Sequence, residues 1–441
     1  MLRNAFRLKL LSVLVLTLTS HHTKAGVLLE LYQQAITNNP TILSKQFIID
    51  QTKAREDLAF SKLLPQITAN GSYSKNQYNS ISTGVQNYPG LRGVVQARQA
   101  LFDLATFLRY RSAEDSTRQA TAEQDAYRLE LSGELLDRYL LTLEAVDKIS
   151  YLQEEKNAVD MQVKRLTEMQ KRQMVKITDL YEVQAYHEQL ATQIIEAENE
   201  KAISLEQLRE ISGILPTNLD LLSVQLFPKA PNNVEQWISD AINSNPGLYA
   251  LHAALDSAEH NMAASRADHL PVLSLQAIET YSDQSFDNRQ ISPTGNGYQV
   301  SSVNLLVNVP IYEGGRVEAG YHEASAKRQI VLQEFEKLKR EIERQTRSAF
   351  LNASSGESKI DSTLRHLEAI KKTHAAKQQG YELGVNTIVD VLESQRDVYK
   401  AHIEYQKSCY DYARSLIMLR VWSGGLSVEN IEEIDKWFSG H

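Results

Sequence analysis

The sequence predicts an α+β fold built from two structural repeats, each combining a pair of β-strands with very long helices. The same interval separates Asp179 from Gly213 and Asp390 from Gly424, and both intervals carry a 3-4 pattern of apolar and small residues. Two sets of dipeptides repeat with the same regularity: Asn39-Pro40 before Leu64-Pro65, and Asn245-Pro246 before Leu270-Pro271. Matching intervals in the two halves of one chain indicate an internal duplication.

The chain begins with the layout of a secretory signal peptide. Basic residues at positions 3, 7 and 9 precede an apolar run from Leu10 to Leu18, and Thr23-Lys24-Ala25 offers a cleavage site. The apolar run is too short to cross a bilayer as a helix. We therefore expect residues 1–25 to be removed on export, and we expect no lipid anchor because no cysteine stands at the junction.

Net charge and cysteine content bear on which classes of function are compatible with the sequence. The formal net charge is -8, and loss of the basic signal peptide makes the mature chain still more acidic. A nucleic-acid-binding face needs clustered Lys and Arg, so we expect no nucleic-acid partner. Cys409 is the only cysteine, which excludes an intramolecular disulfide. On a helix rich in small residues, its simplest role is that of a packed small side chain.

Alternating apolar and polar residues mark two pairs of candidate strands. The alternation is clearest between Val303 and Ile311 and is weaker in the first half. Segments of about ten residues with this pattern are typical of outer-membrane strands, although two soluble hairpins would also explain them. The predicted strands are 66–76 and 94–102 in the first half and 272–281 and 302–312 in the second. Loops rich in Gly, Asn, Ser and Tyr join each pair at 77–93 and 282–297.

The rest of the chain is predicted to be helical. Residues 28–63 and 234–268 form a shorter pair of helical segments, whereas 103–172 and 316–379 form a long pair rich in Glu, Lys, Gln and Ala. At 1.5 Å per residue, the long helices reach on the order of 100 Å, which a globular core cannot use. The 3-4 spacing continues after Asp179 and Asp390, and its small residues suit a coiled-coil seam where helices approach closely.

Several motifs in the second half resemble the TolC family of outer-membrane export ducts. They are Tyr381-x-x-Gly384-x-x-Thr387-x-x-Asp390-Val-Leu and, on the same helix, Tyr410-Asp-Tyr412. The Asn-Pro and Leu-Pro dipeptides of both halves are similar to that family too. The resemblance covers nearly all of the mature chain.

The resemblance implies an α+β membrane protein that assembles as a homotrimer. A barrel has to close in a membrane, and the smallest known barrels have about eight strands, so four strands cannot close one alone. Several subunits would therefore have to share one barrel. The resemblance implies three subunits and a 12-stranded transmembrane β-barrel, with four strands from each chain. The long helices would form a coiled-coil α-helical barrel that extends into the periplasm.

The domain boundaries follow from the repeat and the resemblance. Residues 26–230 form the first structural repeat, 231–425 the second, and 426–441 a C-terminal equatorial segment. In family members, this segment and the one near 215–231 form a belt around the middle of the tube. Ordinary loop packing would equally explain the apolar residues expected there: Leu219, Leu221, Val224, Leu226, Trp437 and Phe438.

The resemblance also implies a gate at the periplasmic tip, held closed by links between helices. The first link would join Tyr381 to Asp179. The second would join Thr178 to position 386, where the family's arginine is replaced by Asn386. An amide donates a hydrogen bond without charge assistance, so this link should be the weaker one. The alternative is that Tyr381 and Asp179 only cap their helices.

Two acidic residues are candidates for lining the entrance. Asp390 and Glu393 share one helix face because residues three apart are neighbours on a helix. Their positions match the aspartates that line the periplasmic entrance in TolC-like ducts, with glutamate in place of the second. A trimer would present a ring of carboxylates there, which attracts cations. A solvated helix surface is the alternative interpretation.

The expected function is an outer-membrane channel-tunnel that exports proteins or small toxic molecules. It would connect an inner-membrane ABC or RND-type transporter, through a periplasmic adaptor, to the cell exterior. The expected location is the outer membrane, in contact with its lipid, with an extension into the periplasm. The sequence leaves open which of the two cargo classes is exported.

Two other classes of function remain as alternatives. The first is a periplasmic coiled-coil structural or adhesive protein without a channel. The second is a secreted enzyme, which the residues do not favour: the eleven histidines are scattered, and neither His-Glu-x-x-His nor a Cys/His cluster with metal spacing occurs. We therefore expect no catalytic residues, no cofactor and no metal.

Overall fold

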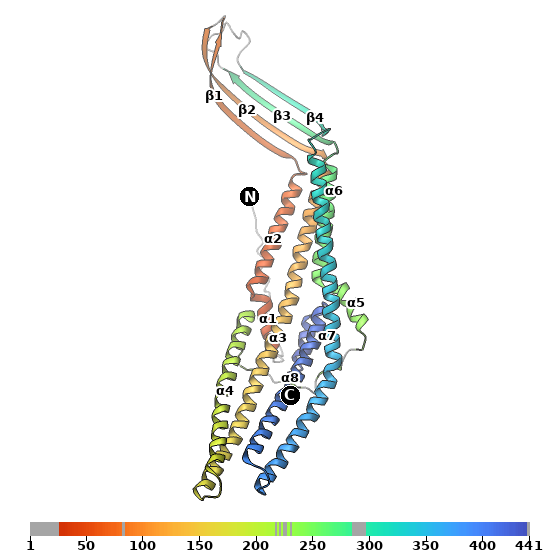
Figure 1. The fold of residues 1–441 in the computed structure, drawn as a ribbon. Helices are drawn as coiled ribbons and strands as arrows, with labels where there is room; N and C mark the ends of the chain where they lie inside the picture. Colours follow the sequence, from red (N-terminus) through yellow and green to blue (C-terminus); the bar gives the residue numbers. More distant parts are fainter. Residues whose placement is uncertain are drawn as a thin grey trace, which may run out of the picture.

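The molecule is elongated, with a β-sheet at one end and long helices running away from it (Figure 1). The computed structural model describes residues 26–81, 84–216, 218–219, 222–223, 227–229, 232–284 and 297–438. The predicted signal peptide, residues 1–25, lies outside the described residues.

Within the described residues, one antiparallel sheet has the order β1-β2-β3-β4. Its strands are β1 (Gln66–Ser80), β2 (Gly84–Phe102), β3 (Val272–Gln284) and β4 (Gly297–Asn308). The β2–β3 ladder, which includes the pair Arg98↔Gln276, joins the two halves of the sequence. In the described chain β1 and β4 each pair on one side only, so both outer edges of the sheet are unpaired.

The predicted strand boundaries of the first half are wrong at one end. Most of the predicted loop 77–93 is strand, because β1 and β2 stay paired up to Ser80↔Gly84. Pairing depends on backbone N–H and C=O groups, which the Gly, Asn and Ser residues of this segment provide as well as apolar residues do. The hydrophobic pattern therefore underestimates the length of these strands.

The second pair of strands differs from its predicted bounds as well. β4 ends at Asn308, four residues before the predicted end, and Asn308 pairs with Val272 at the start of β3. Pro310 has no N–H to donate to a ladder, which disfavours extension of the strand through it. β3 runs on to Gln284, and residues 285–296 of the predicted loop 282–297 lie outside the described residues.

The helices follow the predicted duplication. The first half contains α1 (Val27–Asn38), α2 (Pro40–Ser61), α3 (Leu104–Lys171) and α4 (Ile177–Ser212). The second half contains α5 (Val234–Ser244), α6 (Pro246–Ala267), α7 (Arg316–Glu382) and α8 (Ile388–Trp422), followed by α9 (Val428–Asp435). Helices α3 and α7 have 68 and 67 residues, which corresponds to about 100 Å each. Across the described residues, none of the helices combines the length and the apolar character needed to cross a membrane.

The Asn-Pro dipeptides mark helix boundaries, which divide each predicted shorter segment into two helices. Asn39 accepts a hydrogen bond from the backbone N–H of Thr41 at 2.9 Å, and Asn245 accepts one from Gly247 at 2.9 Å. Each asparagine thus caps the following helix, which begins with proline, a residue suited to the first helical position. Asparagine capping followed by proline therefore explains why the Asn-Pro dipeptide occurs in both halves of the repeat.

A hydrophobic cluster at mid-height joins α1, α3, α4, α8 and α9. Trp437 and Phe438 are buried in it, and the Phe438 ring packs edge-on against Tyr139 with 5.1 Å between ring centroids. Leu219 packs against the same cluster. The other residues predicted for the belt lie outside the described residues: Leu221, Val224 and Leu226.

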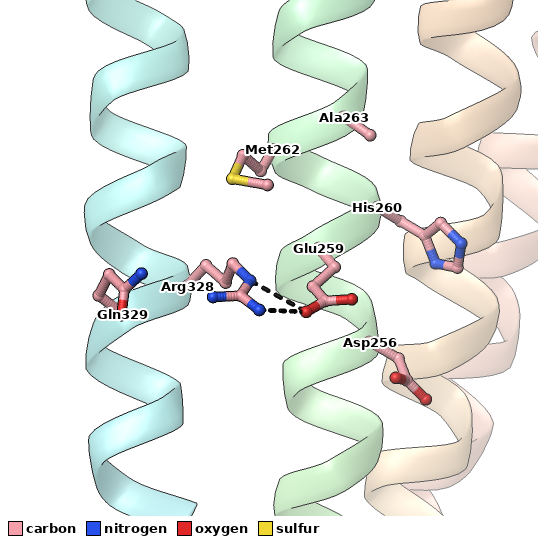
Figure 2. Close-up of a pocket in the computed structure, with 7 residues that line it drawn as sticks. All are labelled: Asp256, Glu259, His260, Met262, Ala263, Arg328 and Gln329. Carbon is pink, nitrogen blue, oxygen red and sulfur yellow. Dashed lines mark hydrogen bonds and ion pairs between the residues drawn. The ribbon is translucent and has the colours of Figure 1, made fainter.

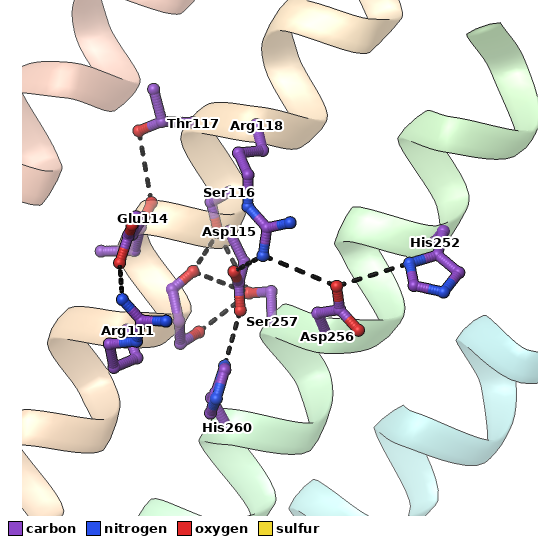
Figure 3. Close-up of polar contacts among 12 residues, drawn as sticks. Arg111, Glu114, Asp115, Ser116, Thr117, Arg118, His252, Asp256, Ser257 and His260 are labelled. Atoms are coloured by element: carbon purple, nitrogen blue, oxygen red, sulfur yellow. Dashed lines mark hydrogen bonds and ion pairs between the residues drawn. The ribbon is translucent and has the colours of Figure 1, made fainter.

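Nearer the sheet, polar contacts join α3 to α6 and α6 to α7. Asp115 on α3 is only 1% exposed, forms an ion pair with Arg118, and lies 2.6 Å from Nδ1 of His260 on α6 (Figure 3). On the other side of α6, Arg328 of α7 donates two hydrogen bonds to Glu259 at the edge of a surface cavity of about 650 Å³ (Figure 2). These contacts hold the helices below the sheet side by side.

Candidate functional site

Two tight connections, each joining two antiparallel helices into a hairpin, form the end of the molecule opposite the sheet (Figure 1). One turn joins α3 to α4, and the other joins α7 to α8. At the second turn Gly384 has a φ of 74°, a left-handed conformation that favours glycine, and the Val385 N–H donates to the Gly380 carbonyl at 2.8 Å. The reversal of direction after α7 therefore has a local, sequence-encoded cause.

Buried apolar side chains hold the two hairpins together near this end. We call this set the tip cluster: Leu152, Val159 and Leu166 of α3, Leu180, Val183, Tyr186, Leu190 and Ala197 of α4, and Ile388, Val391 and Leu392 of α8. Tyr381 is partly buried against it. Because the tip cluster includes α8 as well as α3 and α4, separation of the two hairpins would expose apolar surface and cost free energy.

The structure brings Tyr381 and Asp179 near each other. Burial raises the pKa of Tyr381, and the nearby charge of Asp179 adds to the effect, whereas Arg165 opposes it. Among the described residues, no hydrogen bond joins the Tyr381 hydroxyl to Asp179. Asp179 lies in the first turn of α4 without capping it, because the N-cap position is Lys176.

Among the residues that the structure describes, no hydrogen bond joins Thr178 to Asn386. Thr178 is exposed at the start of α4, while Asn386 donates its side-chain N–H to the Lys377 carbonyl at 3.1 Å. The Asn386 amide lies directly over Gly380, where a Cβ atom would collide with it. Asn386, which lies in the turn after α7, thus satisfies a carbonyl near the C-terminal end of α7, a contact within one hairpin.

Asp390 has a local structural role. Its carboxylate accepts hydrogen bonds from the Thr387 N–H at 2.8 Å and from the Thr387 hydroxyl at 2.6 Å, while its own N–H donates to Thr387. This reciprocal capping box starts α8 and lowers the pKa of Asp390. Glu393 is exposed one turn later. Both carboxylates are accessible at the tip of the single chain.

Several links between the hairpins involve residues that sequence reasoning missed. The guanidinium of Arg396 on α8 lies 4.7 Å from the centre of the Tyr186 ring on α4, and the Tyr186 hydroxyl donates to Glu155 on α3. Arg165 of α3 also pairs with Glu382 of α7 at 3.3 Å. These residues share no motif or repeat interval, so no local sequence signal could have identified them.

Throughout the described part of the chain, no group of three or more His, Cys, Asp or Glu side chains is placed to hold a metal ion. Cys409 is buried, and burial raises the pKa of its thiol to about 11. A thiol that stays protonated at neutral pH is a poor nucleophile.

Comparison with known proteins supports one family. The family model described as outer membrane efflux protein matches residues 31–214 and 237–425. The outer membrane protein TolC of Vibrio cholerae is 27% identical over 92% of this chain and 93% of its own length. The alkaline protease secretion protein AprF of Pseudomonas aeruginosa is 26% identical over 92% of this chain and 86% of its own length.

Solved structures agree in fold. The channel CusC superimposes with a TM-score of 0.81 at 17% identity, covering 90% of this chain and 92% of its own. The outer membrane channel CmeC of Campylobacter jejuni has a TM-score of 0.79 at 18% identity, covering 94% and 90%. With both halves matched by the family model and the same architecture in solved channels, the chain belongs to the outer membrane efflux protein family.

Proposed function

We propose that this protein is a trimeric channel-tunnel of the outer membrane, closed at its periplasmic tip and opened when an inner-membrane pump engages. The observation that carries the proposal is a four-stranded sheet with two unpaired edges that continues into helices of about 100 Å. The sheet is too small to close by itself, and the helices are too long for a compact core.

The unpaired edges support assembly of three copies. Backbone groups on an exposed strand edge form a template for pairing with another chain. Pairing β1 of one copy with β4 of the next would close a barrel of twelve strands, within the range of known outer-membrane barrels. The exposed apolar side chains of β4, among them Val303, Leu305 and Val307, would then face the lipid.

The tip is the proposed gate. In the closed state, the tip cluster, the Tyr381–Asp179 approach and the Arg396–Tyr186 contact hold α7 and α8 against α3 and α4. Asp390 and Glu393 would line the entrance as an acidic ring in the trimer and select for cations. We assign the Thr178–Asn386 pair a smaller role in this gate, because the Asn386 amide donates to the Lys377 carbonyl within the α7–α8 hairpin.

The proposed partners are a periplasmic adaptor and an inner-membrane transporter of the ABC or RND type. Relatives point to two cargo classes: the names of AprF and of the proteases secretion protein PrtF refer to protease secretion, whereas BepC of Brucella suis is named as an efflux protein. The first two match nearly the whole chain and BepC about half of it. This difference in coverage favours protein secretion by an ABC-type system.

Conductance tests the proposal. Protein extracted from outer membranes and added to a planar bilayer should produce discrete, small conductance steps, because the resting tip restricts the passage of ions. A stable trimer that never conducts would instead support a coiled-coil structural or adhesive protein. The cargo class is tested separately, by asking whether deletion of the gene abolishes secretion of proteins or raises sensitivity to small toxic molecules.

A further inference from the structure

A small cavity lies between the helices that meet at the tip. Its volume is about 270 Å³, and α3, α7 and α8 all contribute to its wall. The lining residues are Tyr151, Glu154, Glu155, Lys371, His374, Gln395, Val398, Tyr399 and His402. Three of these residues have a buried side-chain atom that lacks a hydrogen-bond partner among the described residues: Glu155 Oε2, Gln395 Oε1 and His402 Nε2. The cavity is therefore lined by polar groups, and the hydrogen-bonding capacity of some of them is unused.

Two histidines occupy this interface from different helices. The His402 ring on α8 packs against Tyr151 of α3 at an interplanar angle of 49°, with 3.8 Å between ring centroids. His374 on α7 places Nδ1 3.0 Å from the Ser394 hydroxyl of α8. Burial, with a smaller contribution from Lys371, lowers the pKa of His402 to about 4, and burial also lowers the pKa of His374. Both side chains are thus neutral while the helices are packed.

We propose that His402 and His374 form a proton-responsive element that favours separation of α7 and α8 from α3 when the periplasm becomes acidic. The proposal rests on the proposed function, since it requires the tip to open. It goes beyond that function by naming a signal, protons, that acts on the gate without a partner protein.

The direction follows from linkage between proton binding and packing. A histidine in water has a pKa near 6.5, so it gains a proton more readily when the helices separate than when they are packed. The packed state is fully favoured above about pH 6.5 and loses that advantage as the pH falls towards about 4. At about pH 5.5, His402 alone would shift the balance towards the separated state by up to about tenfold.

Other groups around the cavity modify this response. Burial raises the pKa of Glu155, so its proton uptake favours the packed state and opposes the histidines at lower pH. Lys371 remains cationic and disfavours a second positive charge on His402. Glu154 is an exposed carboxylate, and Asp147 lies two turns before it on α3, nearer the sheet, with a pKa that burial raises. The neighbouring hydroxyls and thiol stay protonated because burial raises their pKa: Tyr151, Tyr399, Tyr405 and Cys409.

Single-channel recording of the full-length trimer at about pH 7.5 and about pH 5.5 tests the proposal. Wild type should open more often at the lower pH, by up to about tenfold. The double variant His402→Gln/His374→Gln should lose most of this increase. His366→Gln, an exposed histidine of α7, is the matched control and should respond like wild type. His402→Phe keeps an aromatic ring against Tyr151 but has no group that binds a proton, so it should respond less than wild type.

The outcomes separate this inference from the gate itself. A wild-type channel that does not respond to pH overturns the inference, whatever the variants do. If Tyr381→Phe still opens that channel at about pH 7.5, the gate stands and only the proton response fails. If Tyr381→Phe has no effect either, the proposed gate fails too. A pH response that persists in the double variant assigns the effect to other groups and also overturns the inference.

Discussion

At the scale of single residues, Tyr381 combines two roles that can be separated. Its ring packs against the tip cluster, while its hydroxyl lies near the charge of Asp179. The raised pKa keeps the hydroxyl protonated, so it remains able to donate a hydrogen bond to the carboxylate. A phenylalanine would retain the packing and remove only the donor.

We therefore predict that Tyr381→Phe raises single-channel conductance or open probability. Because, among the described residues, the hydroxyl lies near the carboxylate without a hydrogen bond to it, its contribution is at most that of one hydrogen bond, about 1 kcal/mol, equivalent to up to about a fivefold change in the closed-to-open ratio. Asn386→Ala should have a smaller effect, because the Asn386 amide donates to a carbonyl of the adjoining helix α7 and not to the other hairpin. Equal effects of the two changes in a planar bilayer would contradict this assignment.

Asp390 and Glu393 lead to a second prediction. The variant Asp390→Asn/Glu393→Gln should lose cation preference, measured as reversal potential, and block by trivalent cations from the periplasmic side. Hydrogen bonds from Thr387 lower the pKa of Asp390, so its charge is present at neutral pH and is lost only as the pH falls through that depressed value. The Asp390 contribution to cation preference should thus persist in acid until the pH reaches the depressed pKa of this carboxyl.

A matched control for the entrance variant is Glu368→Gln, which removes one exposed carboxylate from α7 away from the tip. This control should keep both selectivity and block. If the double variant behaves like the control, Asp390 and Glu393 do not line the entrance.

At the scale of elements, the close approach of α7 and α8 depends on glycine. A Cβ atom at Gly356 would lie 2.5 Å from the Tyr412 ring. That ring cannot move away easily, because its hydroxyl donates to the Pro228 carbonyl at 2.9 Å and its edge packs against Phe227. Gly320 lies on the same helix, where a Cβ atom would meet open space.

The two glycines predict opposite effects on stability. Gly356→Ala should lower the free energy of unfolding by about 1–3 kcal/mol through overpacking. Gly320→Ala should raise it by up to about 1 kcal/mol, because alanine is the better helix former. Thermal unfolding followed by circular dichroism measures both. Stabilisation by Gly356→Ala would show that α7 and α8 are not held at this distance.

Local sequence signals predicted the elements they control directly. The Asn-Pro dipeptides, for example, mark the starts of α2 and α6, and each depends only on neighbouring residues of the sequence. Strand length could not be predicted in this way, because a ladder of backbone hydrogen bonds extends through Gly- and Asn-rich segments that carry no apolar pattern. The Arg396–Tyr186 contact joins residues from different helices, which no single-sequence pattern places together.

At the scale of the whole molecule, the position of the β1–β2 turn defines an orientation. The two strands pair up to Ser80↔Gly84, far from the helices, and Ile81 just beyond is fully exposed. Asn87, by contrast, pairs with Gln77 inside the sheet. In the proposed trimer the turn would face the cell exterior, and the α3–α4 and α7–α8 turns would face the periplasm.

We predict that a cysteine at Ile81, introduced together with Cys409→Ala, reacts with a membrane-impermeant thiol reagent on intact cells. The protein should extract from outer membranes as a heat-modifiable trimer. Protection of this cysteine in intact cells, combined with labelling after lysis, would reverse the proposed orientation.

The duplication has a consequence for symmetry. Since each chain contains two similar halves joined through the β2–β3 ladder, a trimer would present six nearly equivalent sectors around its axis. The equivalence ends at the tip, where Asp390 caps α8 while Asp179 leaves α4 uncapped. A partner that grips the tube along its length would meet sixfold repetition, whereas motions at the tip would follow the threefold axis.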